Sequence, residues 1–202
     1  MGRLRVILIG GPSNVGKSTL AEFLAQKLGW SHLSTDSLGR HPGRPWRTKP
    51  ATVPAHVAEH YLSLLVDELF DDVLRHYRSL LPAIEAIVTR HATDGSADCL
   101  VMEGSALWPE SVATLNLENV AAVWLTANNQ FLQARIYNAS QFAVATRREQ
   151  MMIQKFLERA QRYNERMMEA VNRLGLASIN VEAVSSLEEL SDVCLELLRK
   201  PV

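Results

Sequence analysis

Short apolar runs recur along the chain, separated by longer segments in which apolar and polar residues mix. The first run, LRVILI, is aliphatic and ends in glycine, which favours a buried strand of a parallel sheet. The second run, SHLST, is the most polar and so indicates a strand only weakly. We expect strands over residues 4–9, 31–35, 99–102, 120–126 and 176–181.

Between these runs, apolar residues recur three or four positions apart, which is the spacing of one helix face. Gly29 and Gly175 follow two such segments as C-terminal stops, and Pro54 stands in the first turn of another. Ser186 and Glu189 have the spacing of a capping box. We expect helices over residues 18–28, 54–79, 82–91, 128–137 and 149–174, and a last helix from residue 186.

Strands that alternate with helices indicate right-handed βαβ units and a mostly parallel sheet covered on both faces. The expected fold class is therefore α/β, in a single domain over residues 1–202. Ligands of such sheets bind at the carboxyl ends of the strands. We therefore expect functional residues in the loops that follow the strands.

Composition narrows the class of protein. Apolar residues make up 47% and charged residues 21% of the chain, as in ordinary globular domains. The net charge of −1 provides no basic field for nucleic acid or for an anionic membrane surface. The N-terminal apolar run is too short for a signal sequence, and no later run approaches a membrane span. We expect a cytoplasmic protein in which Cys99 and Cys194 are buried free thiols.

The segment GGPSNVGKST lies between the first expected strand and the first expected helix. It contains the complete pattern G-x-x-x-x-G-K-[ST], whose glycines let backbone N–H groups surround phosphate oxygens. Lys17 would reach the β- and γ-phosphates, and the Ser18 hydroxyl would bind Mg²⁺. We expect a nucleoside triphosphate and Mg²⁺ to be held by Gly11, Ser13, Asn14, Val15, Gly16, Lys17, Ser18 and Thr19.

The rest of the chain distinguishes among nucleotide-binding proteins. A switch GTPase needs an N-K-x-D signature after a later strand, where this chain reads TANNQF, and a large motor ATPase needs a longer chain. The order of elements and the segment GGPSNVGKST, here called the phosphate loop, resemble those of the P-loop small-molecule kinases. This family includes shikimate, gluconate, 2-phosphoglycerate and nucleoside monophosphate kinases. The resemblance covers nearly the whole chain, and the phosphate loop is its sharply specific motif.

This resemblance implies a three-layer P-loop NTPase fold with a five-stranded parallel sheet in the order 2-3-1-4-5. It implies an acceptor-side loop and helices over residues 39–96 and a lid over residues 138–148. The cofactors that it implies are Mg²⁺ and ATP, with ATP in place of GTP as the family default. The partner that it implies is a small hydroxylated molecule, with no role for a membrane.

Two carboxylates follow expected strands. The letters HLSTD resemble the second-strand region of shikimate kinase, where a D-x-D pair holds the acceptor; here Ser34 replaces the first aspartate and Asp36 matches the second. The letters MEGSALWP are similar to the E-G-x-x-L-x-P segment of 2-phosphoglycerate kinase-type proteins, and their Glu103 would hold Mg²⁺ through water or orient an acceptor hydroxyl. Which of the two orients the acceptor stays open. The alternatives are a helix cap or a loop turn for Asp36 and a solvent-facing strand end for Glu103.

Arginines in the second half of the chain match the family by position. Arg135 falls where the family stacks an arginine near adenine, and Arg147 and Arg148 end the lid-like segment NASQFAVATRR. A closing arginine, with Arg148 favoured, would stabilise the transferring phosphoryl group. Arg159 and Tyr163 reproduce the R-x-x-x-Y spacing of shikimate kinase, in which the arginine touches the acceptor. A solvated helix charge is the alternative for each arginine.

The loop over residues 39–50 is rich in glycine and proline and contains basic but no acidic residues. Guanidinium groups bind phosphates and carboxylates in bidentate fashion, so these residues indicate a phosphorylated or carboxylated acceptor. The alternative is that they only keep the loop solvated. Trp46 and Trp108 would line the same pocket or serve as plain packing. The basic residues are Arg40, Arg44, Arg47 and Lys49.

His56, Glu59 and His60 spell H-x-x-E-H, a zinc-protease signature. So short a pattern recurs by chance, and the sequence offers no identifiable third ligand. We therefore expect no zinc on this motif and place it on a helix that flanks the acceptor pocket.

The function that the sequence favours is ATP-dependent phosphorylation of a small, hydroxylated, anionic metabolite. The alternative is a nucleotide-binding regulatory protein with slow ATP hydrolysis. An enzyme acting on nucleic acid ends ranks third, because the basic residues cluster in one short loop and aromatic residues are sparsely interleaved with them.

Overall fold

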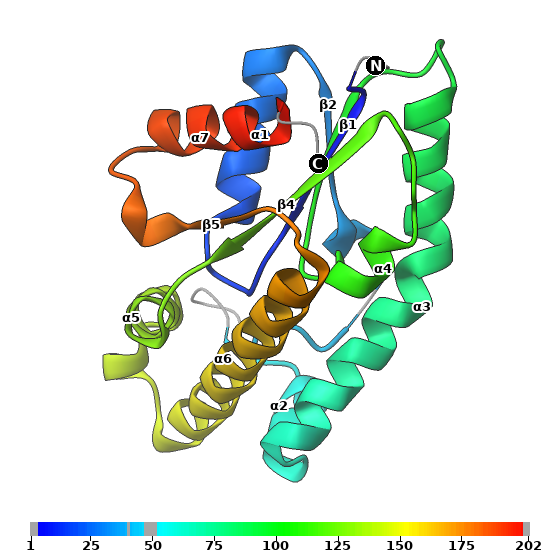
Figure 1. Ribbon diagram of the computed structural model, residues 1–202. Helices are drawn as coiled ribbons and strands as arrows, with labels where there is room; N and C mark the ends of the chain where they lie inside the picture. Colours follow the sequence, from blue (N-terminus) through cyan, green and yellow to red (C-terminus); the bar gives the residue numbers. More distant parts are fainter. Residues whose placement is uncertain (1–3, 40, 47–51, 200–202) are drawn as a thin grey trace.

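The computed structural model describes residues 4–39, 41–46 and 52–199 and contains a sheet of five parallel strands (Figure 1). Their order is β2-β3-β1-β4-β5, which confirms the expected α/β fold class and strand order. Each strand lies within two residues of its expected bounds. The strands are β1 (Val6–Gly10), β2 (Ser31–Ser34), β3 (Leu100–Glu103), β4 (Val120–Thr126) and β5 (Ser178–Asn180).

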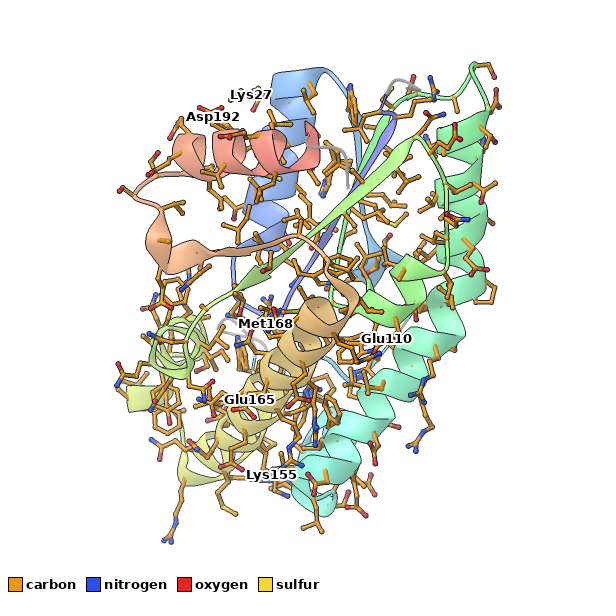
Figure 2. All side chains as sticks on the ribbon, in the orientation of Figure 1. Lys27, Glu110, Lys155, Glu165, Met168 and Asp192 are labelled. Atoms are coloured by element: carbon orange, nitrogen blue, oxygen red, sulfur yellow. The ribbon has the colours of Figure 1, made fainter. Side chains whose placement is uncertain are left out.

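Helices cover both faces of the sheet. Helices α1 and α7 lie on one face, and α3, α4 and α6 on the other (Figure 1). On the outer surface, Lys27 of α1 pairs with Asp192 of α7 at 2.6 Å (Figure 2). The helices are α1 (Lys17–Leu28), α2 (Ala55–Ser63), α3 (Val66–Thr93), α4 (Pro109–Ala113), α5 (Asn129–Ser140), α6 (Arg147–Leu174) and α7 (Leu187–Arg199); short 3-10 turns are η1 (Thr35–Ser37), η2 (Phe142–Val144) and η3 (Val181–Ala183).

Strand β1 shows how the sheet joins two cores. Val6 and Leu8 belong to the core beneath α3 and α6, whereas Ile7 and Ile9 belong to the core beneath α1 and α7. All of these side chains are at most 1% exposed. A strand buried on both faces reads as a continuous apolar run, which is why LRVILI predicts it.

The expected helix over 54–79 is wrong, because the chain breaks at Leu64 and Leu65 into α2 and α3. Both residues are extended, with ψ of 147° and 164°. Lys155 of α6 donates to the Leu64 carbonyl at 2.6 Å, and the Leu65 N–H donates to the Glu68 carboxylate at 2.7 Å. The break is thus stabilised partly from another helix, which the local pattern does not record.

The expected break before Pro82 is also wrong, because α3 runs through this proline. Pro82 lies on the exposed side of the helix. There, the carbonyl that loses its helical hydrogen bond can be solvated, so the helix continues.

The segment that the sequence assigns to a lid is more helical than expected. Helix α5 continues to Ser140, and α6 already begins at Arg147. Between them, the rings of Tyr137 and Phe142 stack at 4.0 Å, and the Thr146 N–H donates to the Glu149 carboxylate at 2.8 Å. The segment is therefore a compact turn packed beside α6.

The two cysteines and the apolar character of the helices can be compared with the sequence-based expectations. Both cysteines are free; Cys194 is buried as expected, whereas Cys99, at the entrance to β3, is partly exposed. Among the described residues, no helix combines the length and the apolar character needed to cross a membrane.

Gly104 packs so tightly against η1 that a methyl group cannot be accommodated. Its φ is +155°, and a Cβ at this position would overlap the Thr35 hydroxyl and lie 2.8 Å from Thr35 Cβ. We expect Gly104→Ala to lower the free energy of unfolding by about 3 kcal/mol, from overpacking and backbone strain. Urea denaturation measures this loss.

The matched control is Gly95→Ala, since a Cβ on Gly95 meets nothing within 4 Å. We expect this variant to change the stability by less than about 0.5 kcal/mol. Equal effects of the two substitutions would show that the contact with Thr35 does not constrain Gly104.

Candidate functional site

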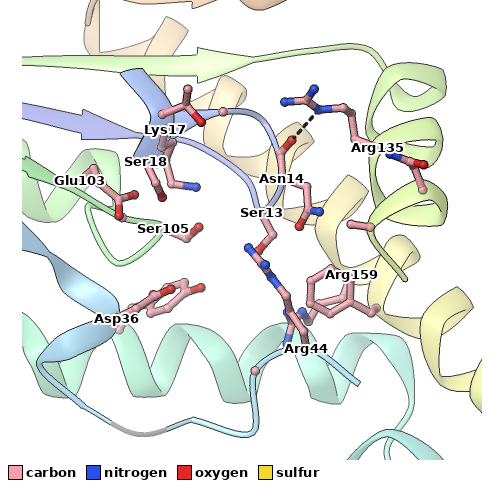
Figure 3. Close-up of a pocket in the computed structure, with 18 residues that line it drawn as sticks. Ser13, Asn14, Lys17, Ser18, Asp36, Arg44, Glu103, Ser105, Arg135 and Arg159 are labelled. Carbon is pink, nitrogen blue, oxygen red and sulfur yellow. Dashed lines mark hydrogen bonds between the residues drawn. The ribbon is translucent and has the colours of Figure 1, made fainter. Parts of the chain in front are cut away.

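A cavity of about 510 Å³ opens at the carboxyl ends of β1 and β3 (Figure 3). One wall is the phosphate loop with the first turn of α1, together with the end of β3. The opposite wall is formed by η1, residues 43–44, and side chains from α3, α5 and α6. Its position is the one expected for a ligand of a parallel sheet.

The backbone of the phosphate loop leaves N–H groups open to the cavity. Asn14 and Gly16 both have positive φ, 66° and 110°, and Gly16 caps α1 without a side chain. The first-turn N–H groups of α1 therefore lack a side-chain cap and carry the positive end of the helix dipole. Of the predicted phosphate-binding residues, those that line the cavity are Ser13, Asn14, Gly16, Lys17, Ser18 and Thr19.

The other two predicted loop residues, Gly11 and Val15, are buried behind this surface. The Gly11 carbonyl accepts a hydrogen bond from the Ser105 hydroxyl at 2.9 Å. The Ser105 carbonyl accepts one from the Tyr163 hydroxyl at 2.7 Å, and Tyr163 is 4% exposed. A chain of hydrogen bonds thus links α6 to the phosphate loop and fixes its shape.

Lys17 is a buried cation at the centre of this wall, 8% exposed. Its Nζ donates to the Pro12 carbonyl at 2.8 Å. Burial lowers the pKa of Lys17 to about 8, and the carboxylates of Glu103 and Asp36 partly counter this effect. The nearby carboxylates therefore do not fully compensate for the burial of the ammonium group.

The two predicted carboxylates lie on the cavity in different surroundings. Glu103 is 3% exposed at the end of β3, so it is not a solvent-facing residue. Asp36 is exposed on η1, and it is not the cap of that turn, because Ser34 accepts the Asp36 N–H at 3.4 Å. A solvent-facing Glu103 and a helix cap at Asp36 are therefore excluded, whereas the position of Asp36 on a short exposed turn agrees with its loop-turn alternative.

Arg159 faces the phosphate loop from α6 (Figure 3). It is 6% exposed, and its guanidinium lies over the rings of Phe156 and Tyr61, at 4.7 Å and 5.6 Å from their centroids. Among the described residues, one terminal nitrogen is buried without a hydrogen-bond partner, and no carboxylate forms a salt bridge with the guanidinium. A buried unpaired charge is costly, so this group is suited to an anionic ligand.

Arg44 is the described member of the basic loop, and it lines the cavity near Arg159 (Figure 3). Arg40, Arg47 and Lys49 lie outside the described residues. The tryptophans pack beside the site without lining it, Trp46 on Phe156 at 4.8 Å and Trp108 on Tyr163 at 5.2 Å.

The remaining predicted arginines separate into two groups. Arg135 of α5 lines the cavity over Phe131, and its Nε donates to the Asn14 carbonyl at 3.5 Å (Figure 3). Arg148 is exposed in the first turn of α6 and does not line the cavity. Arg147 borders a separate apolar groove. The structure therefore brings Arg135 and Arg159 to the site and leaves Arg147 and Arg148 outside it.

Solved structures share this architecture across nearly the full chain. A gluconokinase from Sinorhizobium meliloti 1021 is 19% identical, with 98% of this chain and 93% of that chain covered and a TM-score of 0.56. A deoxyadenosine kinase from M. mycoides with bound dATP is 13% identical, with coverages of 96% and 100% and a TM-score of 0.52. The chain has the fold of the P-loop small-molecule kinases.

A shikimate kinase from Aquifex aeolicus vf5 agrees, at 12% identity, coverages of 96% and 95% and a TM-score of 0.52. No family model and no curated protein matches the sequence. At such identities the likeness extends to the P-loop kinase fold, and the acceptor has to be inferred from the side chains of the cavity.

Sequence reasoning missed Ser105, Tyr77 and Phe156 as cavity residues. Ser105 lies directly after the strand-end pair Glu103-Gly104, which is a signal that could have identified it. Tyr77 and Phe156 occupy positions on helix faces, where an aromatic residue reads as core. Burial raises the pKa of Tyr77 to about 12, so its hydroxyl stays protonated and can donate a hydrogen bond.

A smaller cavity of about 180 Å³ adjoins the first on the side away from the phosphate loop. Asp36, Gly43 and Tyr77 border both cavities. His41 and His76 line the smaller cavity, and burial, with the nearby Arg159 guanidinium, lowers the pKa of His41 to about 4. The space beyond Asp36 can therefore receive the body of a second ligand.

The burial of Lys17 predicts that its removal stabilises the ligand-free protein. A pKa of about 8 in place of 10.5 corresponds to about 3 kcal/mol against the folded state below pH 8. Removal of the lysine leaves the Pro12 carbonyl without this donor, which costs about 1 kcal/mol. We expect Lys17→Met to raise the free energy of unfolding by about 2 kcal/mol at about pH 7. The gain should shrink as the pH rises from 8 to 10.5, where the unfolded chain binds more protons than the folded one.

Urea denaturation at about pH 7 and about pH 10 measures this difference. Lys27→Met on the same helix is the control, because Lys27 is partly exposed and paired with Asp192. A Lys17→Met variant that is less stable than the parent at both pH values would contradict the account.

Proposed function

We propose that this chain transfers the γ-phosphoryl group of ATP to a hydroxyl group of a small anionic metabolite. The observation that carries the proposal is the pair of opposed walls of one cavity. A phosphate loop forms one wall, and the buried guanidinium of Arg159 lies on the other, with one terminal nitrogen that has no hydrogen-bond partner among the described residues. The kinase fold supports this arrangement as a site for a nucleotide and a second substrate.

The nucleotide side rests on the phosphate loop. The α- and β-phosphates would accept hydrogen bonds from the N–H groups of the loop and of the first turn of α1. Lys17 would leave the Pro12 carbonyl for the β- and γ-phosphates, which restores the negative charge that its site lacks. Arg135, at the rim beside Asn14, would cover the adenine.

The side chains also fit Mg²⁺. The Ser18 hydroxyl and the buried Glu103 carboxylate both line the cavity, and oxygen atoms are the ligands that this ion prefers. Ser18 would bind it directly and Glu103 through water. When bound, Mg²⁺ neutralises charge on the phosphate oxygens.

The acceptor would lie beyond Asp36. Arg159 and Arg44 would bind its carboxylate or phosphate, and the smaller cavity would hold its body. Asp36 borders both spaces, so we assign to it the orientation of the acceptor hydroxyl and leave Glu103 with the metal. A cytoplasmic location, where ATP and phosphorylated metabolites occur together, is part of the proposal.

The reaction needs little covalent chemistry from the protein. The acceptor oxygen bonds to the γ-phosphorus while the bond from that phosphorus to the β–γ bridging oxygen breaks, and ADP leaves. The hydroxyl proton passes to the Asp36 carboxylate and then to solvent. The side chains contribute mainly position and positive charge around the transferring group.

A panel of hydroxylated carboxylates and sugar phosphates tests the proposal. We expect release of ADP from Mg·ATP to accelerate with one acceptor class, and Lys17→Ala to reduce this rate about 100-fold or more because the phosphoryl charge loses its buried cation. ADP is measured by a coupled assay. Slow hydrolysis that no acceptor changes would favour a nucleotide-binding regulatory protein instead.

Arg159→Ala tests the acceptor side separately. We expect the KM for the acceptor found by the panel to rise about 100-fold, since a buried charge pair is lost, while the KM for ATP stays within about twofold. Arg166→Ala, an exposed arginine of the same helix paired with Glu169, is the control. An unchanged acceptor KM in Arg159→Ala would exclude this arginine from acceptor binding.

A further inference from the structure

A cluster of metal-ligand side chains lies outside the cavity that contains the phosphate loop and beside the smaller cavity, which one of its members, His41, also lines. His41 comes from the segment over 41–46, His60 from α2 and Asp72 from α3. One ligand atom from each lies within 4.8 Å of the other two. His41 Nε2 is 3.3 Å from Asp72 Oδ2, and His60 Nε2 is 4.0 Å from the same oxygen.

Two features of this histidine–aspartate cluster point to a missing ligand. His60 Nε2 is buried, and no hydrogen-bond partner among the described residues satisfies it, which is a rare condition for a buried polar atom. Asp72 Oδ1 is held by Arg75 at 2.9 Å, so Oδ2 is the oxygen turned toward the imidazoles. Asp72 is 32% exposed, which leaves a path from solvent to a site whose histidine side chains are 13% and 12% exposed.

We propose that His41, His60 and Asp72 bind one divalent transition-metal ion, with zinc as the probe and water as the fourth ligand. Two imidazole nitrogens and a carboxylate oxygen are a common donor set for such ions. In a tetrahedral zinc site with bonds of about 2.1 Å, the ligand atoms lie about 3.4 Å apart. The two separations from Asp72, 3.3 Å and 4.0 Å, approach this spacing, and the two histidine ligand atoms lie within 4.8 Å of each other, so the side chains must draw together by up to about 1.4 Å to complete the site.

Metal binding changes two hydrogen bonds of His41. The Gly43 N–H donates to His41 Nδ1 at 3.2 Å, so the neutral ring carries its proton on Nε2 and donates it toward Asp72. A metal on Nε2 requires that proton on Nδ1 instead, and the bond from Gly43 is then lost. The bond from His41 Nε2 to Asp72 is lost as well, while no proton leaves the ring. Two weak hydrogen bonds are thus exchanged for coordination of the ion by three segments of the chain.

The proposed site is not the H-x-x-E-H motif. His56 and Glu59 are exposed and take no part in the cluster, although His60 belongs to both. Its partners His41 and Asp72 are supplied by a loop and another helix. Helix α2 therefore carries both a proposed ligand, His60, and a matched control residue, His56.

The test is zinc binding by the full chain without a histidine tag, after treatment with a chelator and in the absence of nucleotide. We expect one zinc ion per chain, bound with micromolar or tighter affinity in competition with a chromophoric chelator, and a rise in Tm when zinc is added. His60→Ala and Asp72→Asn should each weaken binding at least tenfold and remove the rise in Tm. Asp72→Asn keeps the shape of the side chain and so guards against misfolding.

His56→Ala should leave zinc affinity and the zinc-induced rise in Tm unchanged. Lys17→Ala should also retain zinc binding, which separates this proposal from the kinase proposal. No binding at micromolar zinc, or binding that His60→Ala leaves unaltered, would overturn the site. Loss of binding in His56→Ala equal to that in His60→Ala would also overturn it, by pointing to the helix motif instead.

Discussion

The organisation of this molecule depends on positive charge that is buried without enough negative charge to match it. Lys17 and Arg159 face one cavity from opposite walls, and both are nearly inaccessible to solvent. Burial lowers the pKa of Lys17 to about 8, and Arg159 retains a buried nitrogen without a partner. Such positions weaken the ligand-free fold, and anions that fill the cavity remove the penalty.

The fold holds these cations in place through contacts made far away in sequence. Parallel pairing of β1 with β3 brings the phosphate loop beside Glu103, and the close approach of Gly104 to Thr35 fixes η1 at the edge of the cavity. Helix α6 contributes Arg159 and, one turn later, Tyr163, whose hydroxyl holds Ser105 beneath the loop. The same helix therefore supplies a ligand-binding charge and supports the opposite wall.

Much of this arrangement can be predicted from residues that are close together in the sequence. The phosphate loop is contiguous, and β1 is a continuous apolar run because both of its faces are buried, so both can be predicted from neighbouring residues. Asp36 and Glu103 were found because strand ends meet at one edge of a parallel sheet. The spacing of Arg159 and Tyr163 places both on one helix face, directed at the site.

What the sequence did not predict depends on contacts between distant segments. The break between α2 and α3 involves Lys155 of α6, and α6 begins two residues earlier than the pattern suggests, with Arg148 exposed in its first turn. The histidine–aspartate cluster joins three separate segments. No local pattern contains such information, and only packing reveals it.

The central claim is that the γ-phosphoryl group passes to a small anion held by Arg159. Its most direct test follows ATP with a labelled γ-phosphoryl group, incubated with the protein, Mg²⁺ and a mixture of small metabolites. The account predicts that the label appears in one organic phosphate, formed in proportion to the ADP released. Label that accumulates in inorganic phosphate alone, at a rate that the metabolites do not change, would contradict it.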